Sequence, residues 1–484
     1  MKRPGAKNPA NTVKKQRRSA VLETFKINEQ YLEKKFVEGF RKNLNADFKP
    51  FPHWQLRNFV SNEENWVEKV EEELQNFPDW QRKENDLYSL YQSEDLKSID
   101  PLKYPAIYSF RQFLYTEVRN WLQNVSGVEL IDKVDSNGSC YARTDSLLPH
   151  NDLSFFHIDT RRFAFVYYLT ASNWDSEKFG GKLQIFNCDK NLQPTDVAKE
   201  FAPLRNSFML FEVSEKSWHR VAELLADEPR LSINGWFHSE RIIEPKKPKV
   251  EKIRRFLAEN KFDVAQLVHF NYLAKKRQNQ IQQLFAETSE LNLNKFLIPE
   301  IHNQIYNELA ENPSCFDTFG PISKRTISRL SMKKATQNVE KMEFTMMLLK
   351  CIKSKNFMKM VEKMTGVTIA GAQCALKISR IEHGSFWVLG DEDAEQSATD
   401  GYSLDVHLFV QKKRWDEEAG GDLIYIAEGE KEELLRINST PNTASIVFCE
   451  PGVMSFLKFA NSKSTDPFFL FTISYYNVQV VDDD

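Results

Sequence analysis

The chain has 484 residues, and its 65 lysines and arginines nearly balance its 68 aspartates and glutamates, giving a formal net charge of −3. This balance does not favour direct nucleic-acid binding. No apolar run reaches the roughly 18 residues of a membrane span. Because domains typically contain about 150 residues, a chain of this length is expected to form two to four domains. Six scattered cysteines without a C-x-x-C pair exclude a zinc ribbon by pattern and indicate a reducing, intracellular compartment.

Residues 1–19 form a basic segment with two clusters, Lys2-Arg3 and 14–18. They contain too few large apolar side chains to offset the entropy of ordering, so we expect disorder. Basic clusters of this kind are typical of nuclear-localisation signals, which predicts a protein of nucleus and cytoplasm. The alternative is a solvated basic tail without a role in import.

Apolar residues recur at helical spacing over 61–77 and 107–125, which predicts two helices. From about 138 to 240 the pattern changes to short β-rich runs separated by Gly, Asn and Asp, at 162–169, 182–186, 207–213 and 230–237. Several short strands at this spacing indicate a β-sandwich or barrel.

A Pro/Lys-rich stretch at 245–249 precedes a charged helical segment that runs to about 310, and short β-runs return beyond about 370. These shifts predict four parts: a tail (1–19), a first β-domain (20–243), a helical connector (244–310) and a second β-domain (311–484). Residues 174–186 (WDSEKFGGKLQIF) resemble 415–425 (WDEEAGGDLIY) in sequence and in their flanking strands. The two β-domains are therefore predicted to be an internal duplication.

One set of residues in the first β-domain has the pattern of a catalytic metal site. His150-Asn151-Asp152 supplies an H-x-D pair, His219 a distant histidine, and Arg230 follows eleven positions later. Two histidines and a carboxylate form the facial triad of non-haem iron(II) oxygenases. An arginine at this spacing is suited to hold the distal carboxylate of 2-oxoglutarate through its planar fork.

A second H-x-D pair, His157-Ile158-Asp159, lies nearby and is the alternative anchor for the pattern. Strand alternation gives a separate indication, because Arg230, Ser232 and Asn234 share one face opposite two apolar residues. A polar stripe opposite an apolar face predicts that it lines a cavity. The alternative is an edge strand whose arginine faces water.

Four stretches together resemble a known family: 140–152 (CYARTDSLLPHND), 161–165 (RRFAF), 218–221 (WHRV) and 230–238 (RLSINGWFH). They look like the ribosomal prolyl 3-hydroxylases, the 2-oxoglutarate- and iron-dependent oxygenase domain-containing proteins whose fly member is called Sudestada. The resemblance covers nearly the whole chain. It implies a mainly β fold with flanking helices, built as two double-stranded β-helix (jelly-roll, cupin-like) domains in tandem, of which only the first is catalytic.

The resemblance also implies roles for individual residues. The iron ligands would be His150, Asp152 and His219, and the residues that contact 2-oxoglutarate would be Tyr141, Tyr168, Arg230 and Ser232. The implied cofactors are Fe(II), 2-oxoglutarate and O₂, with ascorbate as reductant. One departure is that eight residues (153–160) separate the first H-x-D from the Arg161-Arg162 strand, where the family has only a few.

The implied substrate is one proline of the small-subunit ribosomal protein at the decoding centre, hydroxylated at C3, with effects on translation. One alternative is a non-catalytic jelly-roll scaffold in translation or mRNA regulation. Another is an oxygenase that acts on a different substrate.

Alignment of the duplicated strands by their texture places Phe456 opposite His219 and Leu470 opposite Arg230. Without an imidazole or a guanidinium, the second domain is expected to bind neither iron nor 2-oxoglutarate. Its expected roles are structural support, substrate docking or binding of translation factors.

Overall fold

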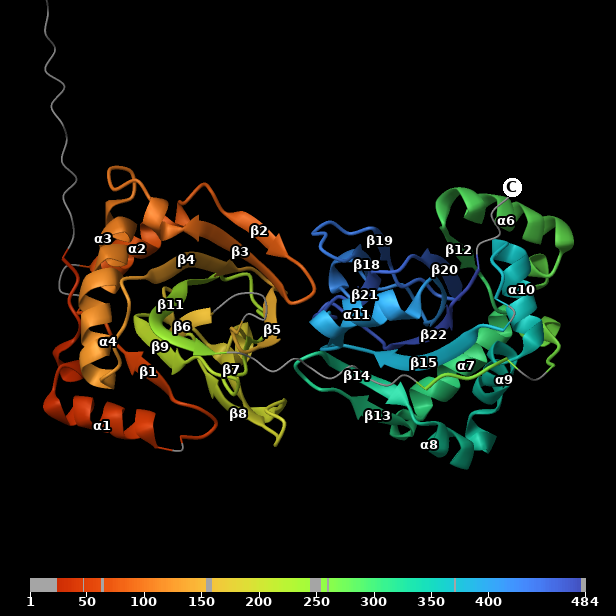
Figure 1. Cartoon of the computed structure of the whole chain (residues 1–484), viewed down its shortest axis with the longest axis horizontal. Helices are drawn as coiled ribbons and strands as arrows, with labels where there is room; N and C mark the ends of the chain where they lie inside the picture. Colours follow the sequence, from red (N-terminus) through yellow and green to blue (C-terminus); the bar gives the residue numbers. More distant parts are fainter. Residues whose placement is uncertain are drawn as a thin grey trace, which may run out of the picture.

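The computed structural model describes residues 24–46, 48–61, 65–153, 159–243, 254–258, 261–369 and 371–479. The expected disorder of residues 1–19 falls outside these ranges, as does His157 of the alternative ligand pair. Two curled β-sheets lie side by side along the long axis of the molecule, each with helices on its outer flank (Figure 1). Within the described ranges, every helix is too short or too polar to cross a membrane.

The first sheet has eleven strands, all paired antiparallel, in the order β1-β9-β6-β11-β4-β3-β5-β10-β7-β8, with β2 paired to β3. The strands are β1 (His53–Arg57), β2 (Gln81–Glu84), β3 (Tyr88–Asp95), β4 (Val134–Tyr141), β5 (Ser146–His150), β6 (Asp159–Tyr168), β7 (Leu183–Cys188), β8 (Pro194–Phe201), β9 (Ser207–Glu212), β10 (His219–Val221) and β11 (Arg230–Ile243). The four predicted strands all form, as β6, β7, β9 and β11.

Helices cover the outer face of this sheet. They are α1 (Lys34–Asn45), α2 (Trp66–Gln75), α3 (Pro105–Phe113) and α4 (Arg119–Ser126), with the one-turn α5 (Ser176–Phe179) elsewhere in the domain. The first predicted helix begins at Trp66, later than expected. The second is interrupted by a π-helical turn at Leu114–Val118 and ends at Gly127, which has a φ of 70°. Leu231 and Ile233 face the core under these helices, so the opposite face of β11 points into the barrel.

The second sheet repeats the first strand for strand, in the order β12-β20-β17-β22-β15-β14-β16-β21-β18-β19, with β13 paired to β14. Its strands are β12 (Glu290–Asn294), β13 (Phe316–Phe319), β14 (Arg325–Leu330), β15 (Gln373–Ile381), β16 (Phe386–Trp387), β17 (Ser403–Val410), β18 (Leu423–Ala427), β19 (Leu435–Ile437), β20 (Thr443–Cys449), β21 (Val453–Leu457) and β22 (Phe468–Tyr476). The shared order of eleven strands confirms the internal duplication and the tandem double-stranded β-helix fold.

The boundary expected at 310 does not match the structure. Strand β12 pairs with β20 inside the second sheet, and apolar residues from Leu267 onward belong to the second domain's core. The charged, helical sequence pattern of 244–310 predicts a connector and gives no sign of the five-residue strand β12 within it. The second domain's helices are α6 (Lys275–Thr288), α7 (Pro299–Glu311), α8 (Met332–Gln337), α9 (Glu343–Ile352), α10 (Lys355–Thr365) and α11 (Asp391–Asp400).

Strand register corrects the expected equivalence at the third histidine. Ile185 and Tyr425 each lie four residues after a Gly-Gly pair, at Gly181 and Gly421. Because β10 places His219 opposite Ile185 and β21 places Ser455 opposite Tyr425, the residue equivalent to His219 is Ser455. The expected Phe456 is wrong by one position.

The arginine position is corrected in the same way. Tyr141 and Ile381 end equivalent strands, β4 and β15, and they pair with Arg230 and Phe468 respectively. The residue equivalent to Arg230 is therefore Phe468, and Leu470 is equivalent to Ser232. The chemical conclusion stands, since neither corrected position carries an imidazole or a guanidinium.

Candidate active site

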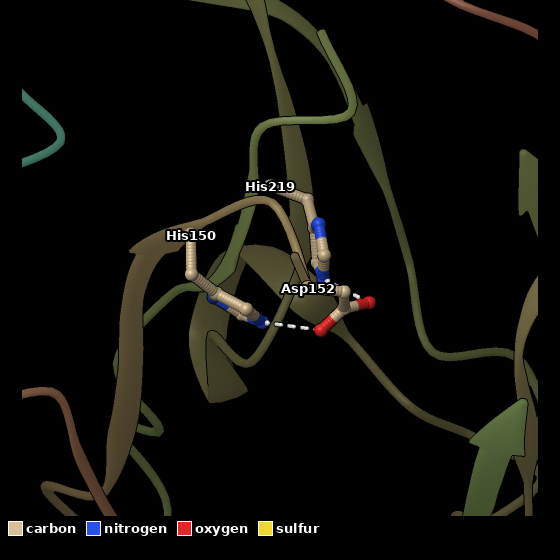
Figure 2. Close-up of side chains that lie close together, drawn as sticks. All are labelled: His150, Asp152 and His219. Atoms are coloured by element: carbon tan, nitrogen blue, oxygen red, sulfur yellow. Dashed lines mark ion pairs between the residues drawn. The ribbon is translucent and has the colours of Figure 1, made fainter. Parts of the chain in front are cut away.

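Three side chains converge at one end of the first barrel. His150 is the last residue of β5 and His219 the first of β10, and the two are direct cross-strand partners. Asp152 follows His150 in a loop, so that His150 Nε2 lies 3.4 Å from Asp152 Oδ1 and His219 Nε2 lies 3.7 Å from Asp152 Oδ2 (Figure 2). One ligand atom from each residue falls within 4.8 Å of the others. Across the described residues this is the one group of histidine, cysteine and acidic side chains with metal-binding spacing.

The histidine tautomers are set by the backbone. His150 Nδ1 lies 2.8 Å from the carbonyl of Leu148, and His219 Nδ1 lies 2.8 Å from the carbonyl of Ser217. Since a carbonyl only accepts, each Nδ1 donates its hydrogen and leaves the Nε2 lone pair free for a metal. Burial, reinforced by the neighbouring His150, lowers the pKa of His219 to about 4. His219 is therefore neutral near pH 7, as a ligand must be.

Asp152 is held from two sides. Its φ of 65° is uncommon for a residue with a side chain, and Arg161 Nη1 donates to its backbone carbonyl at 2.8 Å. Trp236 Nε1 donates to its Oδ2 at 3.2 Å, and the Arg161 guanidinium lies 4.1 Å from the Trp236 ring. Burial alone would raise the pKa of Asp152, but His219, His150 and Arg161 outweigh it and hold that pKa well below its usual value. The carboxylate therefore stays charged at every physiological pH.

Arg161 and Trp236 were not singled out as site residues from the sequence. The signal for Trp236 was available, because the alternation that places Arg230 and Ser232 on one face of β11 extends to Trp236. Arg161 offers no such signal, since its contact with Asp152 depends on the path of a loop.

Arg230 lies deep in the barrel and is 1% exposed. Its Nε donates to the carbonyl of Gly181 at 2.8 Å, its Nη2 lies 3.5 Å from the Tyr168 hydroxyl, and the rings of Tyr141 and Tyr168 each lie 5.0 Å from its guanidinium. No ion pair joins it to a carboxylate of the described residues. A buried charge without a counter-ion is costly, so the surroundings of Arg230 are suited to an anionic ligand. The alternative of an edge strand with a solvated arginine is wrong.

Tyr141, Tyr168 and Ser232 complete the wall around Arg230. All three are buried, and Ser232 lies opposite Tyr168 in the strand register. Burial raises the pKa of Tyr141 to about 12 and also raises that of Tyr168, so both phenols stay neutral hydrogen-bond donors. The structure thus gathers all seven sequence-predicted site residues in one barrel, three at the triad and four at the arginine.

The equivalent positions of the second barrel carry different chemistry. Counting from the paired residues Leu147 and Trp387, His150 corresponds to Gly390 and Asp152 to Glu392. Glu392 forms an ion pair with Lys324 at 2.5 Å. Phe468 packs in an apolar cluster where the first barrel has Arg230. The second barrel therefore keeps a carboxylate at one equivalent position, engaged by Lys324, but has neither histidine nor the arginine at the other three.

Comparisons with known proteins match both halves of the chain. Residues 136–238 match the 2OG-Fe(II) oxygenase superfamily, and residues 259–484 match the family described as "Oxoglutarate and iron-dependent oxygenase degradation C-term". The sequence is 31% identical over 463 residues to prolyl 3-hydroxylase OGFOD1 of Xenopus laevis, covering 86% of this chain and 84% of that protein. It is 28% identical to prolyl 3-hydroxylase sudestada1 of Drosophila melanogaster, covering 82% and 78%.

Among solved structures, a Pseudomonas putida prolyl-4-hydroxylase covers 41% of this chain and 98% of its own, with 16% identity and a TM-score of 0.33.

Proposed function

The chain belongs to the OGFOD1/Sudestada family of prolyl 3-hydroxylases, 2-oxoglutarate- and iron(II)-dependent oxygenases with an Ofd1-type C-terminal domain, and we propose that its substrate is a proline of the small-subunit ribosomal protein at the decoding centre. The observation that carries the enzymatic assignment is the complete donor set. The triad His150, Asp152 and His219 lies in the same barrel as Arg230, which is buried and forms no ion pair with a carboxylate of the described residues. In a scaffold with a vestigial site, no bound anion would offset the energetic cost of burying the Arg230 guanidinium.

The residues present fit Fe(II) and 2-oxoglutarate. His150, His219 and Asp152 would hold the metal through two imidazole nitrogens and one carboxylate oxygen, the facial donor set that non-haem iron(II) oxygenases use. We propose that Arg230 binds the distal carboxylate of 2-oxoglutarate through its Nη atoms, while the hydroxyls of Tyr168 and Ser232 and the ring of Tyr141 line the binding site. The bound metal and co-substrate supply the oxidation, in which O₂ gives one oxygen to succinate, formed with loss of CO₂, and one to a C–H bond.

The protein's own residues hold geometry and exclude water. Leu148 and Ser217 orient the two imidazoles through their carbonyls, Trp236 holds the Asp152 carboxylate, and Arg161 holds the Asp152 backbone carbonyl. Ile185, Met209 and Phe211 are buried in one apolar cluster with Tyr141 and Tyr168, which favours exclusion of bulk water from the surroundings of Arg230. Such pre-organisation is the protein's share in cofactor-dependent oxidation.

Support for proline as the reacting residue comes from the relatives, which are named as prolyl 3-hydroxylases in Xenopus and Drosophila. A relative from Ostreococcus tauri is named a prolyl 3,4-dihydroxylase. We propose a single hydroxylation at C3, since the Xenopus and Drosophila relatives, which are named for one hydroxylation, match a larger share of this chain (86% and 82%) than the dihydroxylase does (55%). We also propose ascorbate as the reductant that restores Fe(II) between turnovers.

The test is mass spectrometry of the decoding-centre ribosomal protein incubated with the enzyme, Fe(II), 2-oxoglutarate and ascorbate. We expect a mass gain of one oxygen atom, placed on proline C3 by fragmentation, with one succinate formed per hydroxylation. His219→Ala should give neither product. Succinate formation by the wild-type enzyme without any change in this protein would direct the search to another substrate. No 2-oxoglutarate turnover with any ribosomal protein would favour the scaffold.

A further inference from the structure

The two barrels meet at the edge of the first domain that carries an iron ligand. Strand β5 lies on the side of the first barrel nearest the second domain (Figure 1). Its residue Leu148 is 3% exposed and packs in an apolar cluster with Phe386 and Val388 of the second domain, flanked by Leu87 and Phe459. The junction is therefore an apolar core of its own, built by both domains.

Leu148 links this junction to the metal site directly. Its side chain is held by Phe386 and Val388, and its backbone nitrogen donates to the carbonyl of Leu87 at 2.9 Å. Its own carbonyl accepts from His150 Nδ1 at 2.8 Å. One residue thus contacts the second domain with its side chain and orients an iron ligand with its backbone.

A second contact leads from the junction to Arg230. The Glu223 carboxylate, 8% exposed, lies 2.8 Å from His383 Nε2 and accepts from the Ser462 backbone nitrogen at 2.8 Å, and both partners belong to the second domain. The Glu223 carbonyl accepts from Gly181 N at 3.0 Å. The Gly181 carbonyl accepts from Arg230 Nε at 2.8 Å.

We propose that the second domain is a positioning element for the first domain's active site, acting on the iron site through Leu148 and on the 2-oxoglutarate site through Glu223. The second part rests on the proposed role of Arg230. The inference gives the second barrel a role in the reaction although it lacks the donor set itself. Phe386, Val388 and His383 are positioning residues, since none of them touches metal or co-substrate.

The first test targets the apolar contact. Phe386→Ala and Val388→Ala remove packing from Leu148, and the matched control Val406→Ala removes the same methyl groups from a buried site in a separate core of the second domain. The probe is Mn(II), whose free-ion EPR signal disappears on binding and which needs no 2-oxoglutarate. We expect Phe386→Ala and Val388→Ala to weaken Mn(II) binding about 10-fold, as loss of support for a metal ligand does.

Val406→Ala should lower the thermal stability of the apoprotein and leave Mn(II) affinity unchanged. Equal Mn(II) affinities for Val388→Ala, Val406→Ala and wild type would overturn the iron part of the proposal. Val388→Ala is the milder truncation and carries the test where Phe386→Ala fails to fold.

The second test targets the polar contact. Glu223→Gln and His383→Ala should weaken 2-oxoglutarate binding to the Mn(II)-loaded protein several-fold and leave Mn(II) affinity unchanged. The control Glu433→Gln removes a carboxylate that pairs with Arg436 within the second domain, and it should change neither affinity. A general loss of stability would lower the affinity for both ligands, whereas the proposal predicts weaker 2-oxoglutarate binding with unchanged Mn(II) affinity.

Arg230→Ala separates failure of this inference from failure of the proposed function. If Arg230→Ala leaves 2-oxoglutarate affinity unchanged, the assignment of Arg230 is wrong. If Arg230→Ala weakens it but Glu223→Gln and His383→Ala do not, the assignment stands and the coupling through Glu223 is wrong.

Discussion

The indole nitrogen of Trp236 donates a hydrogen bond to Oδ2 of Asp152 at 3.2 Å. A hydrogen bond to a charged group contributes about 1.5–3 kcal/mol, and partners of metal ligands typically change metal affinity by about 10- to 100-fold. Trp236→Phe leaves an aromatic ring next to Arg161 but removes this donor. We expect it to weaken Fe(II) binding by about 10-fold, measured by anaerobic titration of the 2-oxoglutarate–iron charge-transfer absorption.

Trp54 offers a matched control for that substitution. Its indole nitrogen is buried without a hydrogen-bond partner in the described structure, so Trp54→Phe removes an N–H group that makes no bond. Fe(II) affinity should be unchanged in Trp54→Phe. Equal Fe(II) affinities in the two variants would show that Trp236 does not orient Asp152.

Arg230→Lys tests the clamp for 2-oxoglutarate. Lysine keeps the charge but has no planar fork, so it cannot pair bidentately with a carboxylate. We expect the KM for 2-oxoglutarate to rise about 10- to 100-fold, the equivalent of one lost charge-assisted hydrogen bond, while Mn(II) affinity stays the same. A parallel loss of Mn(II) affinity would instead indicate that the substitution disturbs the whole barrel.

Metal stoichiometry tests the division of labour between the barrels. The first barrel carries the triad, whereas the second has Gly390, Glu392 and Ser455 at the equivalent positions. We expect one Fe(II) per chain by elemental analysis of anaerobically loaded protein, and none with His219→Ala. Residual stoichiometric iron in His219→Ala would place a metal outside the triad, with His157 as the first candidate to substitute.

The residues of the site could be predicted correctly from the sequence, whereas the residue-by-residue register of the strands could not. The order of His150, Asp152, His219 and Arg230 is a local pattern with fixed chemistry, and the structure brings all four to one barrel. The equivalences of Phe456 and Leu470 were wrong because register depends on hydrogen bonds between strands far apart in the chain. Texture alone does not specify which residue lies opposite Tyr425 or Ile381. Strand β12 was missed for the same reason, since it is defined by its pairing with β20.

Gly235 should tolerate no side chain. A Cβ built there would lie 1.8 Å from the carbonyl oxygen of Asp135 on the paired strand, and backbone cannot move aside as a flexible side chain can. Gly235→Ala should destabilise the fold severely, seen as a large drop in melting temperature or loss of soluble protein. The contrasting substitution is Gly39→Ala, at an exposed position inside α1 with nothing within 4 Å of the new Cβ. It should stabilise by about 0.5–1 kcal/mol.

The pair of His383 and Glu223 should make the junction between the barrels sensitive to pH. The hydrogen bond to Glu223 raises the pKa of His383 above 6.5, against the opposing effect of burial. A raised pKa in the folded state means that the stabilisation is fully present below the unfolded value of 6.5 and is lost as pH rises through the folded value. The melting temperature of wild type should therefore exceed that of His383→Ala most clearly below about pH 6, and the difference should shrink towards pH 8 and above.

The difference in melting temperature between wild type and His383→Ala isolates the effect of His383, because other titrating groups at the junction are present in both proteins. Lys458 is one of them, because burial and the nearby Arg82 lower its pKa to about 8 while it pairs with Glu84. Half of the His383 side chain is exposed, so the difference should be a few degrees at most and should diminish in high salt. A difference that is constant with pH would show that His383 stabilises the junction by packing on Phe459 and not through its charge.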